Sequence, residues 1–196
     1  MKHVVITIGR EYGSGGRLIA QKVAEKLSLV YYDNEIIELA AQELGFDPEI
    51  CKVLNSKKST NWMYNLYAGT NTVSVTDQVY QAQYDIIKHL AAADSCIIVS
   101  HCADYILEDE EDVKKIFIYA PLEERVKRVA EDYKEAQGMD VKKYVQKQDK
   151  NRAGYYNYYT SNRWGDRKNY DLLINSSMGL DLAAQLIVDY INGSEE

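Results

Sequence analysis

The chain has 196 residues, of which 46% are hydrophobic and 27% are charged, and its formal net charge is −7. This length supports one sizeable core with a small lid, and the composition excludes a disordered chain. An acidic balance argues against general nucleic-acid binding and leaves small anionic ligands open. The first residues do not resemble a signal peptide, and no apolar run approaches the roughly 18 residues of a membrane span. We therefore expect a cytoplasmic protein with no nucleic-acid or membrane partner.

The cysteines and histidines indicate no metal site. Cys51, Cys96 and Cys102 are odd in number and form no CxxC pair, so neither a disulfide framework nor a tetrahedral zinc site is expected. His3 and His89 have no partner at ligand spacing. We expect ordinary thiols and no protein-built metal site.

The first part of the chain alternates strand and helix patterns. Residues 3–8 form an apolar, β-branched run typical of a strand in a parallel sheet, and residues 16–28 place apolar side chains at helical spacing. Residues 29–32 favour a second strand, and residues 35–44 favour a helix. From about 47 to 76 the periodicity fades into polar sequence, which indicates a loop or insertion.

The alternation continues in the second part. The expected elements are a helix over 77–94, strands over 96–100 and 114–120, a helix over 122–136, a strand over 170–176 and a helix over 180–192. A stretch rich in Lys, Tyr and Arg, residues 140–168, precedes the last strand. Strands that alternate with helices predict an α/β fold with a parallel, helix-flanked sheet.

The stretch IGREYGSGGRLIA, residues 8–20, places four glycines between a strand and a helix. Backbone N–H groups of such a turn converge on an anion, and the partial positive charge of the helix N-terminus adds to the attraction. Glycine lets this backbone adopt positive φ and approach phosphate oxygens closely. Four glycines exceed what a tight turn without a ligand requires, so the sequence favours a phosphate-binding loop.

The loop departs from the GxxxxGK(S/T) pattern of many phosphate-binding loops. With Gly15 as the last glycine of the pattern, Gly16 stands in place of the lysine and Arg17 in place of the hydroxyl residue. Arg10 and Arg17 are candidates to restore the missing charge, although a guanidinium is planar and longer than an ammonium. Ser14 is a candidate for the hydroxyl that faces magnesium.

Several motifs resemble the cytidylate kinase family, and most closely its divergent cytidylate kinase-like branch. Ordinary cytidylate kinases carry GxxGxGKG(T/S) and a helix ending LAEKLG, and GSGGRLIAQKVAEKLS follows the same frame. The divergent branch carries REYGSGGR and then YYD, and further matching stretches are IIVSHCADYIL, IFIYAPLEERVKRV, DKNRAGYYNYYT and WGDRKNYDLLIN. The similarity extends over nearly the whole chain. Ser100-His101 stands where the family often has Gly-Arg, and His101 replaces that arginine only weakly unless it is protonated.

The resemblance implies one kinase domain over residues 1–196, in a three-layer P-loop-type fold with a five-stranded parallel sheet, a monophosphate-binding segment and a helical lid. We expect the core to comprise 1–33, 77–131 and 168–196. The monophosphate-binding segment is expected at about 34–76 and the lid at about 132–167.

The same resemblance implies transfer of a phosphoryl group from ATP to a nucleoside monophosphate, CMP or dCMP, with magnesium carried by the nucleotide. Small-molecule nucleotides are the expected partners, and a monomer and a homodimer both stay open. One alternative is a nucleotide-binding regulator or sensor that has lost transfer activity, which the missing lysine and Ser100-His101 favour. Another is a kinase of a different small metabolite.

Individual roles follow from the resemblance. The residues expected to bind the cofactor are Arg10, Gly13, Ser14, Gly15, Gly16, Arg17 and Leu18. Phosphoryl transfer asks a protein mainly for positioning and charge neutralisation, so the residues expected to act in catalysis are Arg17, Arg128 and Arg152. The residues expected to bind the acceptor are Asp33, His101, Asp104, Arg163 and Arg167.

Some of these candidates also have a purely structural interpretation. Asp33 fits an N-cap of the next helix as well as a substrate ligand, and Asp104 fits the cap of a turn. Arg125 lies beside two glutamates and fits a solvated helix face as well as a lid. The tyrosines at 155, 156, 158 and 159, with Trp164 nearby, favour packing of one helix side over base stacking.

Overall fold

The computed structural model describes residues 2–33, 75–99 and 102–193. Several features expected from the sequence lie outside these ranges: the helix over 35–44, nearly all of the monophosphate-binding segment, Cys51 and His101. Within them, the order of strands and helices follows the sequence pattern.

Five parallel strands form one sheet in the order β2-β3-β1-β4-β5, which confirms the predicted fold class. The strands are β1 (Val5–Arg10), β2 (Val30–Tyr32), β3 (Cys96–Ile98), β4 (Val113–Tyr119) and β5 (Leu172–Asn175). β1 ends two residues later than the apolar run predicts, because Gly9 and Arg10 still pair with Phe117 and Ile118 of β4. The central strand therefore ends in a charged residue, Arg10, at the carboxyl edge of the sheet.

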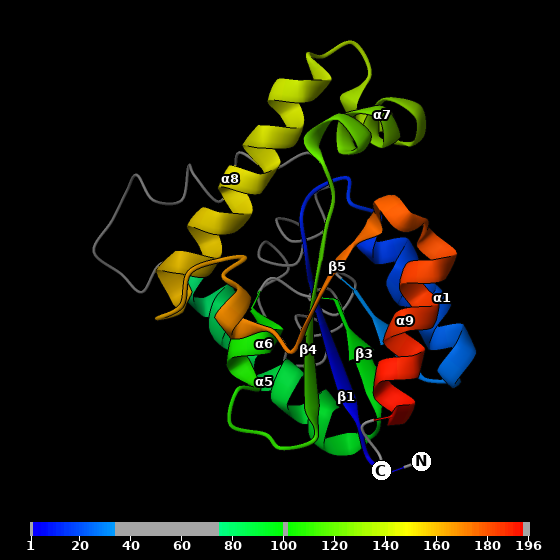
Figure 1. The fold of residues 1–196 in the computed structure, drawn as a ribbon. Coiled ribbons are helices and arrows are strands. Elements are labelled where there is room, and N and C mark those ends of the chain that lie inside the picture. The colour runs from blue at the N-terminus through cyan, green and yellow to red at the C-terminus, as the bar shows by residue number, and fades with distance from the viewer. Residues whose placement is uncertain (1, 34–74, 100–101, 194–196) are drawn as a thin grey trace.

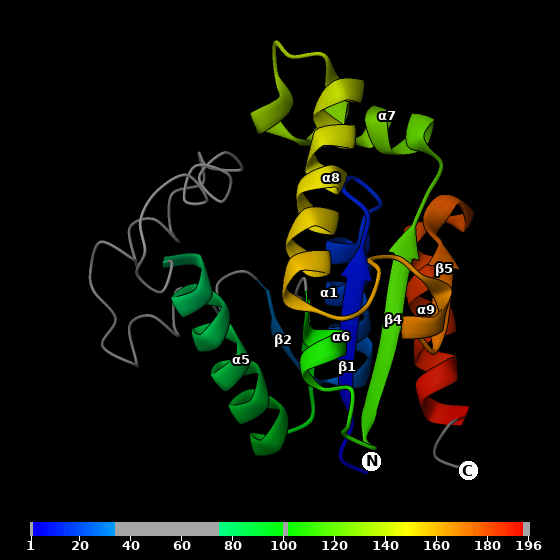
Figure 2. The same ribbon diagram turned by 90° about the vertical axis from the view of Figure 1, so that its left-hand side faces the viewer.

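Helices cover both faces of this sheet (Figures 1 and 2). α1 (Gly16–Leu27) and α9 (Leu180–Gly193) lie together on one face, and α5 (Val75–Ala93) with the short α6 (Ala103–Ile106) lies on the other. Alternate side chains of β1 enter the two cores: Ile6 and Ile8 pack with α1 and α9, whereas Val5 packs with α5 and α6. Burial on both faces explains the β-branched run at the start of β1 and the apolar sequence of β3.

α7 (Leu122–Asp132) lies beyond the carboxyl ends of the central strands, and α8 (Val141–Tyr159) runs from there back towards α5 and α6 (Figures 1 and 2). α7 is shorter than the predicted helix, and the chain continues through the 3-10 turn η1 (Lys134–Ala136) into α8. Asp140 caps α8 by accepting a hydrogen bond of 3.1 Å from the backbone N–H of Lys143. Two further 3-10 turns, η2 (Arg167–Asn169) and η3 (Ser176–Met178), flank β5.

The tyrosines of α8 pack against α5. The ring of Tyr159 stacks on that of Tyr80 with a centroid distance of 4.2 Å, and the Tyr155 hydroxyl donates a hydrogen bond of 2.9 Å to Gln83. Tyr156 is completely buried in the core between the sheet and these helices. The packing interpretation is confirmed for these three side chains, which attach α8 to the body of the protein.

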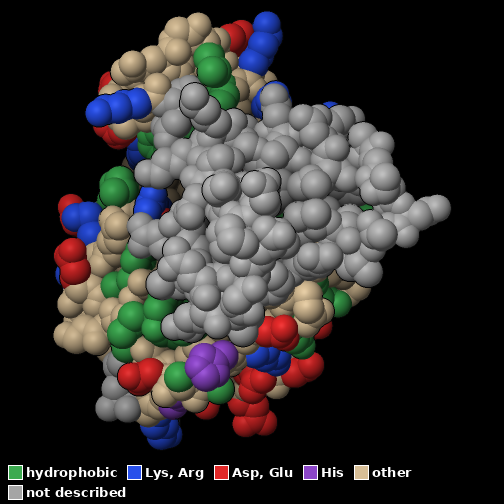
Figure 3. Space-filling view, turned by 180° about the vertical axis from the view of Figure 1, so that it is seen from behind, with side chains coloured by type: hydrophobic (Ala, Val, Ile, Leu, Met, Phe, Trp, Pro, Cys, Tyr) green, Lys and Arg blue, Asp and Glu red, His purple; other side chains and the backbone are tan. Residues whose placement is uncertain are grey.

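The face opposite to the one seen in Figure 1 carries charges of both signs (Figure 3). Around the margin of this view, lysine and arginine side chains alternate with aspartates and glutamates, and its described part has no continuous basic patch. None of the described helices is long and apolar enough to cross a membrane.

Candidate functional site

The loop between β1 and α1 has the backbone of an anion cradle. Gly13 and Gly15 have φ angles of 76° and 80°, in the left-handed region that favours glycine. A Cβ atom added to Gly13 would lie 2.9 Å from the carbonyl oxygen of Arg125, so the loop also requires glycine for space. Gly15 is the N-cap of α1 and provides no side-chain cap. The positive end of α1 is therefore left without a side-chain acceptor at the carboxyl edge of the sheet.

Gly16 occupies the position that holds the lysine in the GxxxxGK(S/T) pattern, and the packing around it explains why this residue has no side chain. A Cβ atom on Gly16 would lie 2.7 Å from Cβ and 3.2 Å from Cγ of Arg10, and 3.3 Å from Cβ of Ile118. The side chain of Arg10 crosses this glycine and is only 7% exposed. A buried guanidinium thus reaches the site from the end of β1.

Asp33 lies just after β2 and faces two of the candidate arginines. Its Oδ2 atom is 2.5 Å from Nε of Arg17, and its Oδ1 atom is 3.7 Å from Nη2 of Arg10. Asp33 is 4% exposed, whereas the Arg17 side chain is 56% exposed. The carboxylate therefore acts as a shared counter-ion. The N-cap interpretation of Asp33 concerns a helix outside the described residues.

Arg128 and Arg152 both contact the loop. Nη1 of Arg128 donates a hydrogen bond of 2.6 Å to the carbonyl oxygen of Gly13, and Nη1 of Arg152 donates one of 2.9 Å to that of Arg10. Among the described residues, no carboxylate forms an ion pair with either guanidinium. The structure thus brings Arg10, Arg17, Arg128 and Arg152 to one loop.

The charge at this loop is unbalanced in favour of cations. Burial and the neighbouring guanidinium of Arg10 lower the pKa of Arg152 to about 9. Burial also lowers the pKa of Arg10, although Asp33 opposes this effect. A guanidinium stays protonated in proteins, so the like charges of Arg10 and Arg152 repel each other. A bound anion would relieve this repulsion.

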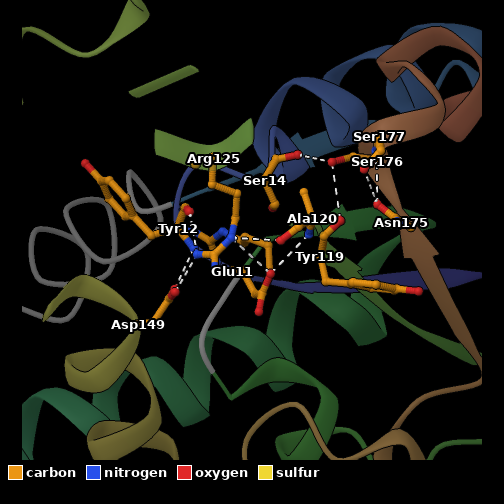
Figure 4. Close-up of polar contacts among 12 residues, drawn as sticks. Glu11, Tyr12, Ser14, Tyr119, Ala120, Arg125, Asp149, Asn175, Ser176 and Ser177 are labelled. Atoms are coloured by element: carbon orange, nitrogen blue, oxygen red, sulfur yellow. Dashed lines mark hydrogen bonds and ion pairs between the residues drawn. The ribbon is translucent and has the colours of Figure 1, made fainter. Parts of the chain in front are cut away.

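The backbone of Ser14 is held by a hydrogen bond, and its side-chain hydroxyl has no partner among the described residues. Its carbonyl oxygen accepts a hydrogen bond of 2.6 Å from the hydroxyl of Ser176, which lies in η3 (Figure 4). The Oγ atom of Ser14 is buried and has no hydrogen-bond partner among the described residues. A buried, unpartnered hydroxyl in an anion cradle fits a phosphate oxygen or a magnesium ion. These features together fit a nucleotide with its metal ion.

Arg125 corrects one interpretation of the sequence. It is buried, and it lies 3.2 Å from Oε2 of Glu11 and 2.5 Å from Oδ2 of Asp149 through Nε and Nη1 respectively (Figure 4). The solvated-face interpretation is therefore wrong, because α8 covers this side of α7. Sequence reasoning also missed Glu11, Asp149 and Ser176. A signal existed for Glu11, because a carboxylate inside a motif that must attract phosphate requires a nearby cation.

The remaining acceptor candidates are not gathered at the loop. Asp104 and Arg163 line a polar cavity with Lys115 and Asp166, and none of its lining residues comes from the loop. Asp104 accepts a hydrogen bond of 2.7 Å from the Tyr156 hydroxyl, and burial raises the pKa of Asp104 to about 6.

Arg167 is exposed on η2, and His101 is outside the described residues. The described part of the chain holds no cluster of three or more His, Cys, Asp or Glu side chains suited to a metal ion.

A parallel sheet whose central strand runs through a glycine loop into an uncapped helix is the phosphate-binding arrangement that P-loop proteins share with Rossmann-type folds. The model of the cytidylate kinase-like family matches residues 5–178. The chain therefore belongs to the cytidylate kinase-like family, as its motifs suggested.

Solved structures agree with this assignment. An uncharacterised protein from Eubacterium ventriosum is 28% identical, with a TM-score of 0.72 over 97% of this chain and 99% of that chain. Shikimate kinase from Acinetobacter baumannii, solved with shikimate, is 13% identical, with a TM-score of 0.58 over 98% and 95% of the two chains. A sugar kinase from Janibacter is 11% identical, with a TM-score of 0.56 over 97% and 95%. The last two likenesses show the shared fold alone. No curated protein matches the sequence.

Proposed function

We propose that the protein transfers the γ-phosphoryl group of ATP to a nucleoside monophosphate, with CMP and dCMP as the first acceptors to test. Family membership and the P-loop kinase fold support a kinase of a nucleotide or small metabolite. The observation that carries the proposal is the glycine cradle at the uncapped end of α1, surrounded by more guanidinium groups than carboxylates.

The residues of the loop supply the binding site for the polyphosphate. Backbone groups from Gly13 to Leu18 hold phosphate oxygens, and the unpartnered hydroxyl of Ser14 is the candidate ligand on the metal side. When bound, ATP supplies the transferable phosphoryl group and Mg²⁺ neutralises part of its charge. Leu18 has no hydroxyl and contributes through its backbone only.

The arginines supply fixed positive charge. Arg128 on α7 and Arg152 on α8 contact the loop from outside the sheet, whereas Arg10 is the last residue of β1 and Arg17 lies in the first turn of α1. Positive charge held at the transferring group stabilises a transition state whose negative charge is spread over several oxygens. We assign residues 132–167 as a lid, because α8 carries Arg152 from outside the sheet to the loop, and residues 34–76 as the acceptor-binding segment.

The proposed acceptor contacts lie in two places. Asp33 lies at the loop, between Arg10 and Arg17, within reach of a group bound there. Asp104 and Arg163 share a separate cavity, so their proposed role requires an acceptor that extends towards α6 or a movement of that region. Arg167 and His101 complete the proposed set.

An ADP-release assay with magnesium and ATP tests the proposal. The acceptor panel comprises CMP, dCMP, UMP, AMP and GMP, followed by shikimate and simple sugars. We expect kcat/KM for CMP or dCMP to exceed that for the purine nucleotides by about 10-fold or more, since a pocket that hydrogen-bonds one base leaves polar groups unpaired with another. ADP release no faster with any monophosphate than with buffer would exclude the nucleoside monophosphate assignment.

A second function is favoured by a specific observation. Gly16 replaces the lysine, and Arg17 is engaged by Asp33, which together support a nucleotide-binding regulator without turnover. Calorimetric binding of ATP with no ADP release on the whole panel would support the regulator. Release with shikimate or a sugar alone would support a kinase of another metabolite.

A further inference from the structure

The side chain of Arg10 occupies the space that a side chain at position 16 would need. Cβ of residue 16, if present, would be 2.7 Å from Cβ of Arg10, a separation that real Cβ atoms essentially never show. Neither atom is the flexible end of a side chain, so the clash can be relieved only by moving β1 or α1. Both elements are fixed, because Arg10 pairs with Ile118 in the sheet and Ile19 of α1 is fully buried in the core.

The neighbouring arginine is less suited to replace a lysine at position 16. Arg17 has a largely exposed side chain, and its Nε atom is 2.5 Å from Oδ2 of Asp33. Arg10 is 3.7 Å from the other oxygen of the same carboxylate, and this Oδ1 atom accepts no hydrogen bond in the described structure. Asp33 thus binds Arg17 closely and holds Arg10 at a longer distance, in a buried position at the loop.

We infer that Arg10 carries the phosphate-facing charge of this loop in place of a lysine at position 16, and that the two positions cannot both hold a side chain. This inference rests on the proposed ATP site. The cation enters from the last residue of β1, and its stem fills the space that a side chain at position 16 would need. Gly16 is then required by Arg10, and the absence of lysine is no loss of the site.

Asp33 has a positioning role in this arrangement. A buried guanidinium without any counter-ion is costly, and a partner in direct contact would compete with phosphate. At 3.7 Å the carboxylate offsets part of the charge of Arg10 and leaves the guanidinium available as a donor.

Calorimetric titration with inorganic triphosphate and with magnesium ATP tests the inference on the full chain. Arg10→Met keeps the side-chain stem and removes the charge, and Arg10→Lys keeps a cation. We expect Arg10→Met to weaken both ligands by about 10-fold or more, the size of one lost charge-assisted contact, and Arg10→Lys to weaken them less. Gly16→Ala should weaken binding through the clash alone.

The decisive comparison moves the charge back to position 16. Arg10→Gly with Gly16→Lys removes the clash and restores a cation, whereas Arg10→Gly with Gly16→Ala is the matched variant without the charge. The 3.3 Å contact with Cβ of Ile118 would still have to be relieved. We expect the lysine variant to bind triphosphate more tightly than its alanine control.

Equal triphosphate affinity of Arg10→Met and the parent would overturn the inference, and so would a folded double variant with lysine that binds no better than its control. If the double variants do not fold, the order parent, Arg10→Lys, Arg10→Met supports the inference, and equal affinities overturn it. A parent protein that binds no ATP at all instead overturns the proposed function.

Discussion

Oδ1 of Asp149 accepts a hydrogen bond of 2.7 Å from the backbone N–H of Tyr12, although the two residues are 137 positions apart. The other carboxylate oxygen of Asp149 pairs with Arg125, whose Nη1 also donates to the carbonyl oxygen of Tyr12 at 3.1 Å. The glycine loop is therefore attached to α7 and α8 through its own backbone (Figure 4). Arg152 lies three residues beyond Asp149 on α8, so the same contact sets where that guanidinium meets the loop.

Asp149→Asn should loosen this attachment. The amide keeps one acceptor oxygen and loses the charge that Arg125 requires, so we expect the free energy of unfolding to fall by about 1–3 kcal/mol. We also expect kcat to fall because Arg152 loses its fixed position. Urea unfolding and the ADP-release assay measure the two effects.

Lys142→Gln is the control. It changes an exposed charge on the same helix and should alter the free energy of unfolding by less than about 0.5 kcal/mol. Parent-like values for Asp149→Asn would mean that α8 is positioned by other contacts.

Gly13→Ala tests whether the loop requires glycine for space or only for its backbone angle. The added Cβ would lie 2.7 Å from Cγ2 of Val129 and 2.9 Å from a backbone oxygen, at a φ of 76°. Gly138 is a matched control, because its φ is 78° and nothing lies within 4 Å of its added Cβ.

We expect Gly138→Ala to cost about 1 kcal/mol from backbone strain alone. Gly13→Ala should cost about 2–4 kcal/mol, because overpacking adds to the same strain. Thermal unfolding of the two variants gives the difference. If they lose equal stability, the close packing around Gly13 has no energetic effect.

The buried carboxyl of Asp104 predicts a specific dependence of stability on pH. Its pKa is raised to about 6 from an ordinary 3.8, mainly by burial. Between these values the folded state binds a proton that the unfolded state has released. The contribution of Asp104 to the free energy of unfolding therefore falls as the pH rises through this window, and the full penalty is present above about pH 6.

Asp104→Asn keeps an acceptor oxygen for the Tyr156 hydroxyl and removes the titration. We expect the variant to be more stable than the parent by about 1–3 kcal/mol at neutral pH, with the difference shrinking towards pH 4. Urea unfolding at a series of pH values measures this difference. A difference that does not change between about pH 4 and 7 would show that Asp104 does not titrate in that window.

Much of the fold could be predicted from local patterns. The strand ending at Ile98 is an apolar run, and β4 contains the apolar stretch Ile116–Ile118; the burial of these residues on both faces of the sheet is the reason that the pattern is so clear. The glycine loop was equally visible, because its requirement for positive φ is local. The same reasoning placed α1 within one residue of its observed end.

The contacts that make the site depend on distance in space. Arg125 lies in an amphipathic helix on a face that looked solvated, and only the packing of α8 onto α7 buries it. The proximity of Arg10 to Gly16 depends on the angle at which β1 enters α1, which the residue pattern does not contain. Likewise, nothing in the spacing of Asp149 indicates a bond to a backbone group near the start of the chain.

Arg152→Met should separate the roles of this residue in activity and in folding. In the proposed reaction its charge acts on the transferring group, so we expect kcat to fall by about 100-fold or more with a smaller change in KM for ATP. The free energy of unfolding of the ligand-free protein should change little, because removing one of two mutually repelling cations offsets the lost hydrogen bond to the carbonyl oxygen of Arg10. Lys150→Met, at an exposed position of the same helix, should change neither quantity. Steady-state kinetics and thermal unfolding of the three proteins test this pair of expectations. Parent-like turnover in Arg152→Met would remove Arg152 from the catalytic set, and a large loss of stability without loss of turnover would make it a structural residue.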